Sequence, residues 1–535
     1  MRVGVDNGQV KTFFPDNADA RPASLLMQGM PHYACGAMDR AKISGITVDS
    51  REVKPGDLFV AIQGEKVDGH QFVEEAIAKG CAAFIVQQGR LPAKNGFPAV
   101  AIEVPDTRTA LAGVAGAFYD HPEKELRFIG ITGTNGKTTT SFLVEAMLNK
   151  AGYIPGVIGT VNYRYQGMEF AATHTTPDPI VLYRTLRRMK DAGVTHVVME
   201  VSSHALAQKR IHGLSFDVAV FTNITRDHLD FHGDMESYFQ SKKKLFFEYL
   251  KKDGRAVIML EMETPHNGQE RTVLVGKGQA LAAELVAPIR CGMERNCDLY
   301  PEDFVCSLAG IKTTIQTPQG RLKLHSSLVG QFNLMNLLTA AGVGIALELS
   351  PETIADGIQS LKNVPGRLER INSRKGLKVF VDYAHTPDAL ANVLTTLKQF
   401  NPPRLICIFG CGGDRDRGKR AMMGKVAGSL CDIALVTSDN PRSERPEAIM
   451  QEIEQGLAHS LLKRIRAELL FENRNWQGYD LIVSRREAIA LAIIRAHQDD
   501  VVLIAGKGHE NYQIIGNHKR FFDDRLEAVG AEFMI

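Results

Sequence analysis

A glycine-rich turn between a predicted strand and a predicted helix constrains the fold of this 535-residue chain more than any other feature. Residues 128–131 are a short apolar run, Phe-Ile-Gly-Ile, and residues 137–150 have the spacing of a helix. Thr-Gly-Thr-Asn-Gly-Lys-Thr at 132–138 joins them. Free backbone N–H groups and the helix dipole at such a junction favour bound phosphate, and glycines let it approach closely. The segment therefore predicts a phosphate-binding loop.

The residue types in this loop suggest individual roles. Lys137 is predicted to meet the terminal phosphates of a nucleotide, and the Thr138 hydroxyl to bind Mg²⁺. The pattern is incomplete, because Ile131 stands where the first glycine of the usual P-loop falls. A tight turn with no nucleotide is the alternative. The predicted nucleotide-binding residues of the loop are Gly133, Thr134, Asn135, Gly136, Lys137, Thr138 and Thr139.

Strand candidates alternate with helix-length segments along the chain, which predicts an α/β fold of three domains. We expect a small α/β domain at 1–122, with strands at 57–62 and 82–86 and a helix at 71–79. We expect a central P-loop ATPase domain with a mostly parallel sheet at 123–364, with strands at 128–131, 196–200, 217–221 and 256–260. A Rossmann-like, doubly wound domain is expected at 365–535, with strands at 378–382, 405–409, 432–436 and 501–505.

Two segments fit this pattern less well. The stretch from about 261 to 306 is irregular and is predicted to be an insertion. The segment before Ile46 is predicted to be a flexible terminal tail.

Bulk properties argue against several kinds of partner. The formal net charge is only +2, so we expect neither a nucleic-acid nor a membrane partner. No apolar run is long enough to cross a bilayer, and the first residues lack an apolar signal core. The eight cysteines form no Cys-x-x-Cys pair, which favours reduced thiols over a zinc site at Cys291, Cys297 and Cys306. We therefore expect a cytoplasmic monomer that acts on small molecules.

Polar residues follow two further predicted strands of the central domain. Glu200 ends the strand at 196–200, and the strand at 217–221 leads into the loop at 225–233, which includes His228 and His232. Because the carboxyl ends of parallel strands meet at one edge, these residues are expected beside the phosphate loop. Glu200 is a candidate Mg²⁺ ligand. The histidine-rich loop is a candidate polar site, with an ordinary surface loop as the alternative.

Eight short motifs agree, in order, with one family. They are Gly133-Thr-Asn-Gly-Lys-Thr138, Met199-Glu-Val-Ser-Ser-His204, Thr225-Arg-Asp-His-Leu-Asp230, Gly330-Gln-Phe-Asn-Leu-Met-Asn336, Pro365-Gly-Arg367, Asp382-Tyr-Ala-His385, Asp439-Asn-Pro-Arg442 and Gly506-Lys-Gly-His-Glu510. From about Ile46 to Phe522 the chain resembles the Mur ligases. The resemblance implies a domain for a UDP sugar, a central ATPase and a domain for an incoming amino acid. It also implies that a substrate carboxylate takes the γ-phosphate of ATP and that an amine then displaces phosphate.

The resemblance implies two Mg²⁺ ions, one bound by Thr138 and Glu200 and a second served by His228. The family also carries a lysine converted by CO₂ to a carbamate, and the best register puts it at Lys242. A slip within Lys242-Lys243-Lys244, or an ordinary basic run, is the alternative. The implied catalytic residues are Lys137, Lys242 and His228, and the implied further ATP-binding residues are Asn333, Asn336, Arg367 and Asp382.

The resemblance also implies the two substrate sites. The residues matching those that hold the UDP-N-acetylmuramoyl dipeptide are Ser50, Thr175, Thr176, Ser202, Gln208 and Arg210. His174 precedes the two threonines where asparagine is common in relatives, which puts that contact in doubt. The residues matching a diaminopimelate pocket are Arg415, Asp439, Asn440, Pro441, Arg442, Gly506 and Glu510. In such a pocket Arg442 would meet the distant carboxylate of the amino acid, and Glu510 its ammonium.

The expected activity is therefore ATP-dependent addition of meso-2,6-diaminopimelate to UDP-N-acetylmuramoyl-L-alanyl-D-glutamate, with ATP and Mg²⁺ as cofactors. Addition of L-lysine or another amino acid to the same nucleotide is an alternative, as is ligation of glutamate to folate. A nucleotide-dependent regulator that binds the cell-wall precursor without turning it over is a third alternative.

Overall fold

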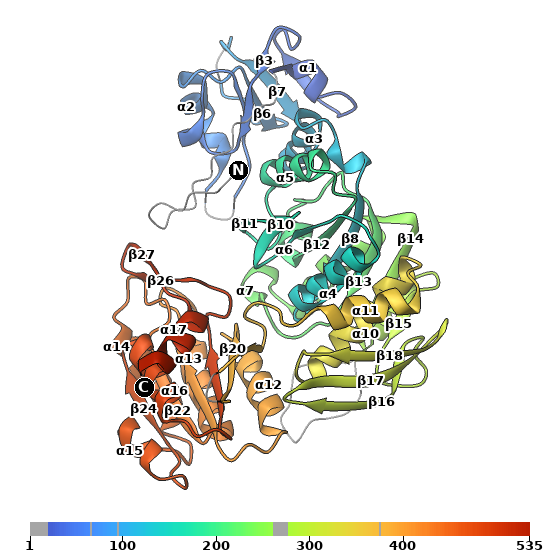
Figure 1. The fold of residues 1–535 in the computed structure, drawn as a ribbon. Helices are drawn as coiled ribbons and strands as arrows, with labels where there is room; N and C mark the ends of the chain where they lie inside the picture. The colour runs from blue at the N-terminus through green and yellow to red at the C-terminus, as the bar shows by residue number, and fades with distance from the viewer. Residues whose placement is uncertain (1–19, 65–66, 94–95, 261–275, 374–375, 535) are drawn as a thin grey trace. The chain divides into compact units, whose positions relative to one another are not determined.

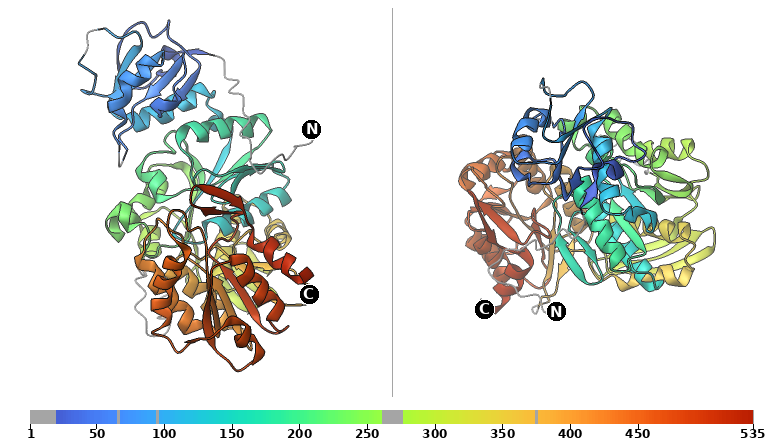
Figure 2. Two further views of the ribbon diagram at one scale, coloured as in Figure 1. Left: turned by 90° about the vertical axis from the view of Figure 1, so that its left-hand side faces the viewer. Right: turned by 90° about the horizontal axis from the view of Figure 1, so that it is seen from above.

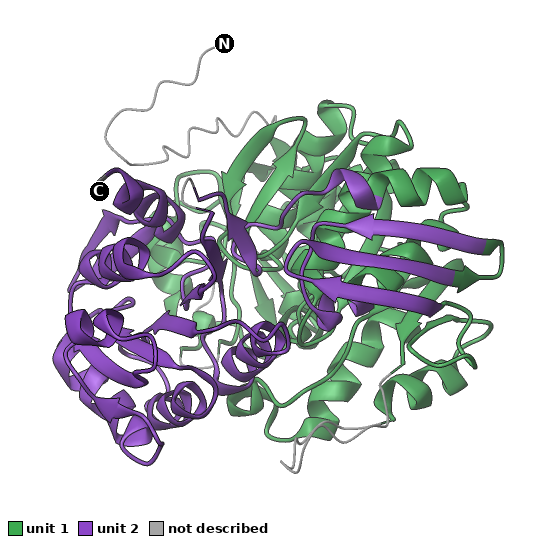
Figure 3. Cartoon of the chain, turned by 60° about the horizontal axis from the view of Figure 1, so that its bottom comes forward, with its two compact units in different colours: residues 1–300, 316–320, 336–357 green, residues 301–315, 321–335, 358–535 purple. Residues whose placement is uncertain are grey.

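The computed structural model describes residues 20–64, 67–93, 96–260, 276–373 and 376–534. The chain forms two compact units (Figure 3). Unit 1 comprises Met1–Tyr300, Gln316–Gly320 and Asn336–Gly357, and unit 2 comprises Pro301–Ile315, Arg321–Met335 and Ile358–Ile535. Unit 1 contains both a small and a large sheet, but residues 301–315, 321–335 and 358–364, which the sequence assigns to the central domain, belong to unit 2 (Figure 1).

The small sheet of unit 1 has five strands in the order β2-β7-β6-β5-β4. The strands are β2 (Tyr33–Cys35), β4 (Gly45–Thr47), β5 (Asp57–Val60), β6 (Ala83–Gln87) and β7 (Val100–Val104), and the helices are α2 (Val73–Ala78) and α3 (Thr107–Phe118). β2 is antiparallel to β7, and the other pairs are parallel. The strands predicted at 57–62 and 82–86 are confirmed with small shifts of their ends.

The prediction of a flexible tail before Ile46 is wrong for the described part of that segment. Residues 20–45 contain β1 (Arg21–Pro22), α1 (Ala23–Leu26), β2 and β3 (Lys42–Ile43). Leu26 and Ile43 are fully buried in the same hydrophobic cluster as Phe118 of α3. Buried apolar side chains fix this stretch to the small domain, and residues 1–19 lie outside the described residues.

The large sheet of unit 1 has eight strands in the order β11-β10-β9-β12-β8-β13-β14-β15. The strands are β8 (Arg127–Thr132), β9 (Pro155–Ile158), β10 (Asn162–Tyr165), β11 (Met168–Ala171), β12 (His196–Glu200), β13 (Phe216–Phe221), β14 (Leu250–Met259) and β15 (Ile289–Cys291). All are parallel except β10, which is antiparallel to both neighbours. The mostly parallel sheet expected for the central domain is confirmed.

Helices α4 (Lys137–Lys150) and α8 (Met235–Phe247) pack against this sheet. Alternate residues of its strands, among them Phe128, Met199 and Phe221, form one core cluster with Leu245 of α8. The other helices of unit 1 include α5 (Pro179–Asp191), α6 (Ser203–Ala207), α7 (Leu229–His232), α9 (Lys277–Glu284) and most of α11 (Pro351–Ser360). Because β8, β12 and β13 are parallel, their carboxyl ends lie at the same edge of the large sheet.

The prediction of an irregular insertion at 261–306 is wrong where the structure describes it. Residues 261–275 lie outside the described residues, but the rest forms α9, β15 and β16 (Tyr300–Ser307). β15 extends the large sheet, and β16 joins β17 (Gly310–Thr317) and β18 (Gly320–Ser326) in a separate three-stranded sheet. Helix α10 (Gln331–Ala346) follows.

Unit 2 is built on a seven-stranded sheet in the order β19-β20-β25-β21-β22-β24-β23, with helices on both faces (Figure 2). The strands are β19 (Glu369–Ile371), β20 (Lys378–Asp382), β21 (Leu405–Phe409), β22 (Ile433–Thr437), β23 (Lys463–Arg464), β24 (Gly478–Ile482) and β25 (Val501–Ala505). Only β19 is antiparallel. The four predicted strands are confirmed. The doubly wound fold is also confirmed, because alternate residues of β21 pack into two different cores, one on each face of the sheet.

The helices of unit 2 are divided between those two cores. Cys407 packs with α12 (Pro387–Lys398), α13 (Gly418–Leu430) and α14 (Pro446–Leu457). Ile406 and Ile408 pack with α15 (Ala467–Glu472), α16 (Arg485–Arg495) and α17 (Asp524–Ala531). The hairpin of β26 (Tyr512–Ile515) and β27 (His518–Phe521) completes the unit. In the part of the chain that the structure describes, no helix is long and apolar enough to span a bilayer.

Candidate active site

The phosphate loop requires glycine at two positions. Gly133 and Gly136 have φ angles of +146° and +85°, in the region that L side chains avoid. A Cβ atom at Gly133 would overlap the Thr222 hydroxyl, and one at Gly136 would overlap the Asn336 side chain. The strand-loop-helix prediction is confirmed, with α4 spanning residues 137–150 as expected.

Residues at the end of β13 hold the loop in place. The Asn223 carbonyl accepts the Thr134 N–H at 3.0 Å, and the Asn223 side chain accepts the Asn135 N–H at 2.9 Å. The Thr222 hydroxyl donates to the Asn135 carbonyl at 2.6 Å. Neither Thr222 nor Asn223 was predicted. Their only sequence signal is their position directly after a strand that neighbours β8.

Two lysines share one acceptor in this loop. The Lys137 Nζ donates to the carbonyl oxygens of Gly133 at 2.8 Å and Thr134 at 2.9 Å. The Lys242 Nζ, from α8, donates to the same Gly133 carbonyl at 3.0 Å. The structure therefore brings together two of the three predicted catalytic residues.

Lys242 has an unusual environment for an ammonium group. Its side chain is almost fully buried, and its Nζ lies 4.3 Å from the centre of the Tyr238 ring. Burial, together with the nearby positive charge of Lys137, holds the pKa of Lys242 well below its ordinary value, while Asp227 opposes the shift. A neutral amine is the form that reacts with CO₂, so the environment fits the chemistry expected at this position. Lys243, by contrast, pairs with Glu284.

The Glu200 carboxylate lies beside the first turn of α4. It is fully buried and accepts hydrogen bonds from the Thr138 hydroxyl at 3.0 Å, the Thr160 hydroxyl at 2.8 Å and the Thr160 N–H at 3.0 Å. Thr160 was not predicted, because it lies between the short strands β9 and β10 rather than in a recognisable motif. The hydroxyl and carboxylate oxygens of Thr138 and Glu200 are the hard donors that Mg²⁺ prefers.

His228 stands at the start of α7 in a left-handed conformation, φ +55°. Its Nε2 lies 3.4 Å from Asp227, and its ring packs edge-on against His204 at 4.8 Å between centroids. Desolvation lowers the pKa of His228, and Lys137 and Lys242 lower it further, whereas Asp227 opposes the shift. His228 therefore favours the neutral imidazole, which can act as a ligand or proton acceptor. No group of three or more His, Cys, Asp or Glu with metal-binding geometry occurs among the described residues.

The predicted dipeptide-binding residues form two groups. Thr176 is hydrogen-bonded to Glu200, the candidate Mg²⁺ ligand: the Thr176 hydroxyl donates to the Glu200 carbonyl at 2.7 Å. The same hydroxyl accepts the Ser202 N–H at 3.0 Å. Arg210 donates to the Gln208 side chain and, at 3.0 Å, to the Thr176 carbonyl. Thr175 contacts Thr160 through its hydroxyl. These five residues are thus contiguous with Glu200, while Ser50 lies in the small domain, where its hydroxyl donates to Glu75 at 2.9 Å.

The predicted ATP-binding residues outside the loop are divided between the units. Asn336 belongs to unit 1 and lies next to Gly136. Asn333, which belongs to unit 2, donates to the Val329 carbonyl at 2.8 Å. In unit 2, the buried Asp382 accepts the N–H groups of Leu368 at 2.6 Å and Ala384 at 2.8 Å. Desolvation raises the pKa of Asp382, and Arg367 opposes the shift.

The predicted amino-acid pocket in unit 2 contains a linked polar group. The Asn440 side chain donates to Glu510 at 2.9 Å, and the fully buried Lys507 donates to Asn440 at 3.2 Å and Glu510 at 3.3 Å. Lys507 was not assigned a role from the sequence, although it lies in a motif that was recognised. Gly506 has φ +115°, and a Cβ there would overlap the Asp439 carboxylate.

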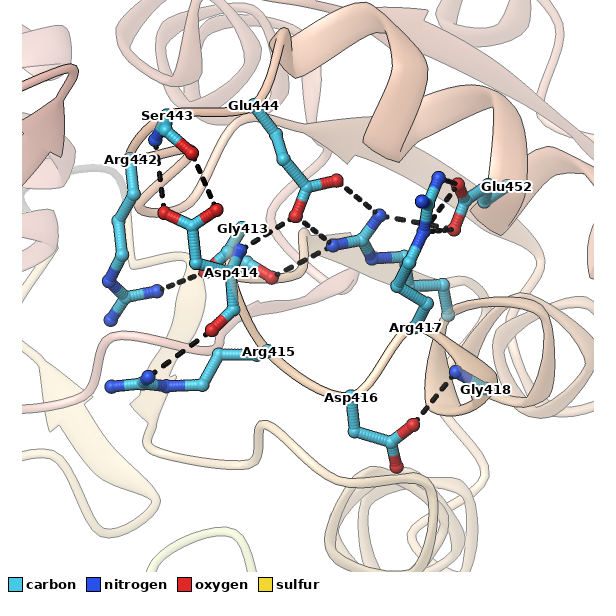
Figure 4. A network of polar contacts seen from close by, with 12 residues as sticks. Gly413, Asp414, Arg415, Asp416, Arg417, Gly418, Arg442, Ser443, Glu444 and Glu452 are labelled. Atoms are coloured by element: carbon cyan, nitrogen blue, oxygen red, sulfur yellow. Dashed lines mark hydrogen bonds and ion pairs between the residues drawn. The ribbon is translucent and has the colours of Figure 1, made fainter. Parts of the chain in front are cut away.

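Two arginines complete this group (Figure 4). The Arg442 Nη1 donates to the Gly413 carbonyl at 2.7 Å, and the Arg415 Nη1 donates to the Asp414 carbonyl at 3.3 Å. A Cβ at Gly413 would overlap the carbonyl of Pro441, so the loops that carry Arg415 and Arg442 are in close contact. The structure thus brings all seven predicted pocket residues to neighbouring strand ends of unit 2.

Family models match most of the chain. The model described as Mur ligase family, catalytic domain, matches residues 42–119, the Mur ligase middle domain matches 131–344, and the Mur ligase, glutamate ligase domain matches 366–508. The chain belongs to the Mur ligase family. The matches cover the phosphate loop, Glu200 and Lys242 in the middle domain and, in the last domain, the predicted amino-acid pocket apart from Glu510.

Several curated relatives of this chain carry the name UDP-N-acetylmuramoyl-L-alanyl-D-glutamate–2,6-diaminopimelate ligase. The protein of that name from Geobacter metallireducens is 46% identical over 92% of this chain and 94% of its own length. The one from Gloeobacter violaceus is 45% identical over 91% and 94%.

Solved structures of Mur ligases have the same fold. A structure bearing the diaminopimelate ligase name has a TM-score of 0.64 and 31% identity, covering 96% of this chain and 99% of its own. The UDP-N-acetylmuramoylalanyl-D-glutamyl-2,6-diaminopimelate–D-alanyl-D-alanyl ligase from Acinetobacter baumannii is 19% identical with a TM-score of 0.60. The match covers 97% of this chain and 99% of that one, and supports the fold alone.

Proposed function

We propose that this chain is an ATP-dependent ligase that joins meso-2,6-diaminopimelate to UDP-N-acetylmuramoyl-L-alanyl-D-glutamate. One observation carries the proposal: Lys137, Lys242, Thr138 and Glu200 converge on a glycine-rich loop at the end of β8. The names of the similar ligases identify the two substrates. Formation of ADP and phosphate follows from the activation of a carboxylate by phosphoryl transfer.

The residues of unit 1 supply the groups that phosphoryl transfer needs. The N–H groups of the loop and the Lys137 ammonium bind and neutralise the phosphates, which positions the γ-phosphate for attack by the substrate carboxylate. Lys137 must leave the carbonyls of Gly133 and Thr134 to do so. Arg210, with its planar fork, is suited to an acidic group of the UDP-linked dipeptide.

We propose that Thr138 and Glu200 hold one Mg²⁺ and that His228 and Lys242 serve a second. Mg²⁺ neutralises the phosphate oxygens when bound. The oxygen donors of Thr138 and Glu200 fit this ion, whereas a histidine nitrogen is a weaker match. Lys242 fits better as a carbamate. Its neutral amine attacks the carbon of CO₂, an N–C bond forms as one C=O π bond opens, and the nitrogen loses one proton. The product presents two oxygens that share one negative charge.

We propose that unit 2 selects the amino acid. Arg442 and Arg415 would bind the distant carboxylate of diaminopimelate, and Glu510 and Asn440 its ammonium. L-lysine has no distant carboxylate, so it would leave the two arginines without their ligand. Arg367 and Asp382 are proposed to contact ATP, and Ser50 the uridine diphosphate. We also propose that the protein acts as a monomer in the cytoplasm, which light scattering and fractionation can test.

An amino-acid competition assay tests the proposed function. Purified protein would receive ATP, Mg²⁺ and the UDP-linked dipeptide with diaminopimelate, L-lysine or L-ornithine. We expect phosphate release that needs the dipeptide and is fastest with diaminopimelate. Higher turnover with lysine would contradict the assigned substrate. Binding of the dipeptide without phosphate release would favour the non-catalytic regulator instead.

A further inference from the structure

The two loops that carry the pocket arginines follow adjacent parallel strands of unit 2. Residues 410–417 connect β21 to α13, and residues 438–445 connect β22 to α14. The Gly413 N–H donates to the Asn440 carbonyl at 2.9 Å, so the loops also pair through the backbone. The positions of Arg415 and Arg442 therefore depend on how these two loops are held together.

Both loops contain a residue in a conformation that needs support. Asp414 and Arg442 each have φ +52°, in the left-handed region. Residues in this region carry backbone strain and persist where the surroundings fix them. The Asp414 carboxylate accepts the Ser443 N–H at 3.2 Å and the Ser443 hydroxyl at 2.6 Å, as Figure 4 shows. These contacts are exposed, so they do not explain how the two loops are held together closer to the sheet.

A partly buried ion pair connects the two loops where they leave the sheet. Arg420, on α13, is fully buried and donates to the two Glu444 oxygens at 2.8 and 2.9 Å. Its Nη2 also donates to the Gly412 carbonyl at 3.4 Å. Glu444 in turn accepts the Asp414 N–H at 2.6 Å. The hydrogen bonds from Arg420 and Asp414 hold the pKa of Glu444 at about 2, so the carboxylate is charged across the working range.

We propose that Arg420 is a positioning residue for amino-acid selection, which clamps Glu444 to the Gly412–Asp414 turn so that Arg415 and Arg442 face the same substrate group. This inference rests on the proposed function. Arg420 has no exposed surface, so it does not touch the amino acid itself. Its two parallel hydrogen bonds to Glu444 need the planar fork of a guanidinium, which lysine does not have. Without the clamp, the arginines lose their common orientation.

Kinetics of four variants test this proposal. Arg420→Met removes the clamp, Arg420→Lys keeps its charge without the fork, and Glu444→Gln weakens it from the other side. Arg417→Met is the control for loss of a cation from the same cluster. Arg417 pairs with Glu452, which also pairs with Arg420 at 3.1 Å, but among the described residues Arg417 makes no hydrogen bond or ion pair with Gly412 or Glu444. For each variant, the KM values for diaminopimelate, ATP and the UDP-linked dipeptide would be measured, together with the diaminopimelate-to-lysine selectivity.

We expect both Arg420 variants to raise the KM for diaminopimelate about tenfold or more and to lower selectivity, with the other two KM values within about twofold. Glu444→Gln should show a smaller rise of the same kind, and Arg417→Met none. Rescue by lysine, or equal rises in all three KM values, would overturn the proposal. If Arg420→Met fails to fold, Arg420→Lys and Glu444→Gln decide. Wild-type protein that does not use diaminopimelate would instead contradict the proposed function.

Discussion

The Lys242 ammonium donates a hydrogen bond to the Gly133 carbonyl, although 109 positions separate the two residues in the sequence. This contact places the middle of α8 against the phosphate loop, and the lysine is buried away from water. The same burial lowers the pKa of Lys242, which makes its neutral form available near neutral pH.

Lys242 is therefore expected to carry the carbamate. Protein equilibrated with ¹³C-bicarbonate should give a carbamate carbon signal in NMR spectra, and Lys242→Arg should abolish both the signal and most of the ligase activity. Lys243→Arg and Lys244→Arg are matched controls and should keep both. A signal that survives in Lys242→Arg and disappears in one of the controls would move the assignment to that residue.

Glu200→Gln should lower the ligase rate by about a hundredfold or more, because it removes a buried negative charge proposed to hold Mg²⁺ while keeping the shape of the side chain. The remaining activity should need more Mg²⁺. Thr140→Val is the control on α4: the Thr140 hydroxyl is buried and has no hydrogen-bond partner among the described residues. Its removal should leave activity and Mg²⁺ dependence unchanged. An unchanged Mg²⁺ requirement in Glu200→Gln would argue against this site.

Arg442→Ala should raise the KM for diaminopimelate about 10- to 100-fold, the range expected for loss of a charge-assisted hydrogen bond, and change the KM for ATP little. Arg445→Ala provides the comparison, since Arg445 is exposed and pairs weakly with Glu447 at 3.9 Å. Initial rates at varied concentrations of each substrate measure both effects. Equal increases in the two KM values would remove the selectivity argument.

Stability should fall in mild acid because of His196, at the start of β12. Desolvation lowers its pKa to about 4, with a smaller contribution from Arg127 in the same direction. Between pH 4 and the ordinary value of 6.5 the unfolded chain binds a proton that the folded chain does not, so stability falls as the pH falls through this window, by up to about 3 kcal/mol.

His196→Gln should reduce this loss, with His518→Gln, on the exposed face of β27, as the control. Calorimetry at pH 4.5 and 7 is the suitable measurement, because the single tryptophan, Trp476, lies in unit 2 and does not report on β12. Equal loss of melting temperature in wild type and His196→Gln would contradict the assignment.

The sequence predicted those helices and strands whose residue patterns match the way they are buried in the fold. Helix α4 and strand β12 begin and end at the predicted residues, because a glycine cap or a run of buried apolar residues defines each end. Strands β9, β10 and β11 were missed. Each has only four residues, and β9 starts with Pro155, a residue that usually argues against a strand.

The residues of the candidate site also divide into those that the sequence predicted and those that it did not. The glycine loop, Glu200 and Arg442 lie in motifs that can be recognised because chemistry restricts the residue types. Thr160 and Arg420 could not be predicted, because their roles depend on contacts over 40 and 24 positions, with Glu200 and Glu444. A threonine or an arginine in isolation gives no sign of such a contact, whereas the folded chain defines it.

The Gly506 N–H donates to the carbonyl of Asp382 at 3.0 Å, and Asp382 pairs with Ala505 across β20 and β25. The segment proposed to meet the nucleotide and the segment proposed to meet the amino acid are therefore joined at one peptide group. A mutation that reshapes this loop would also disturb Asp382. A change of amino-acid preference obtained through this loop should consequently come with weaker nucleotide binding.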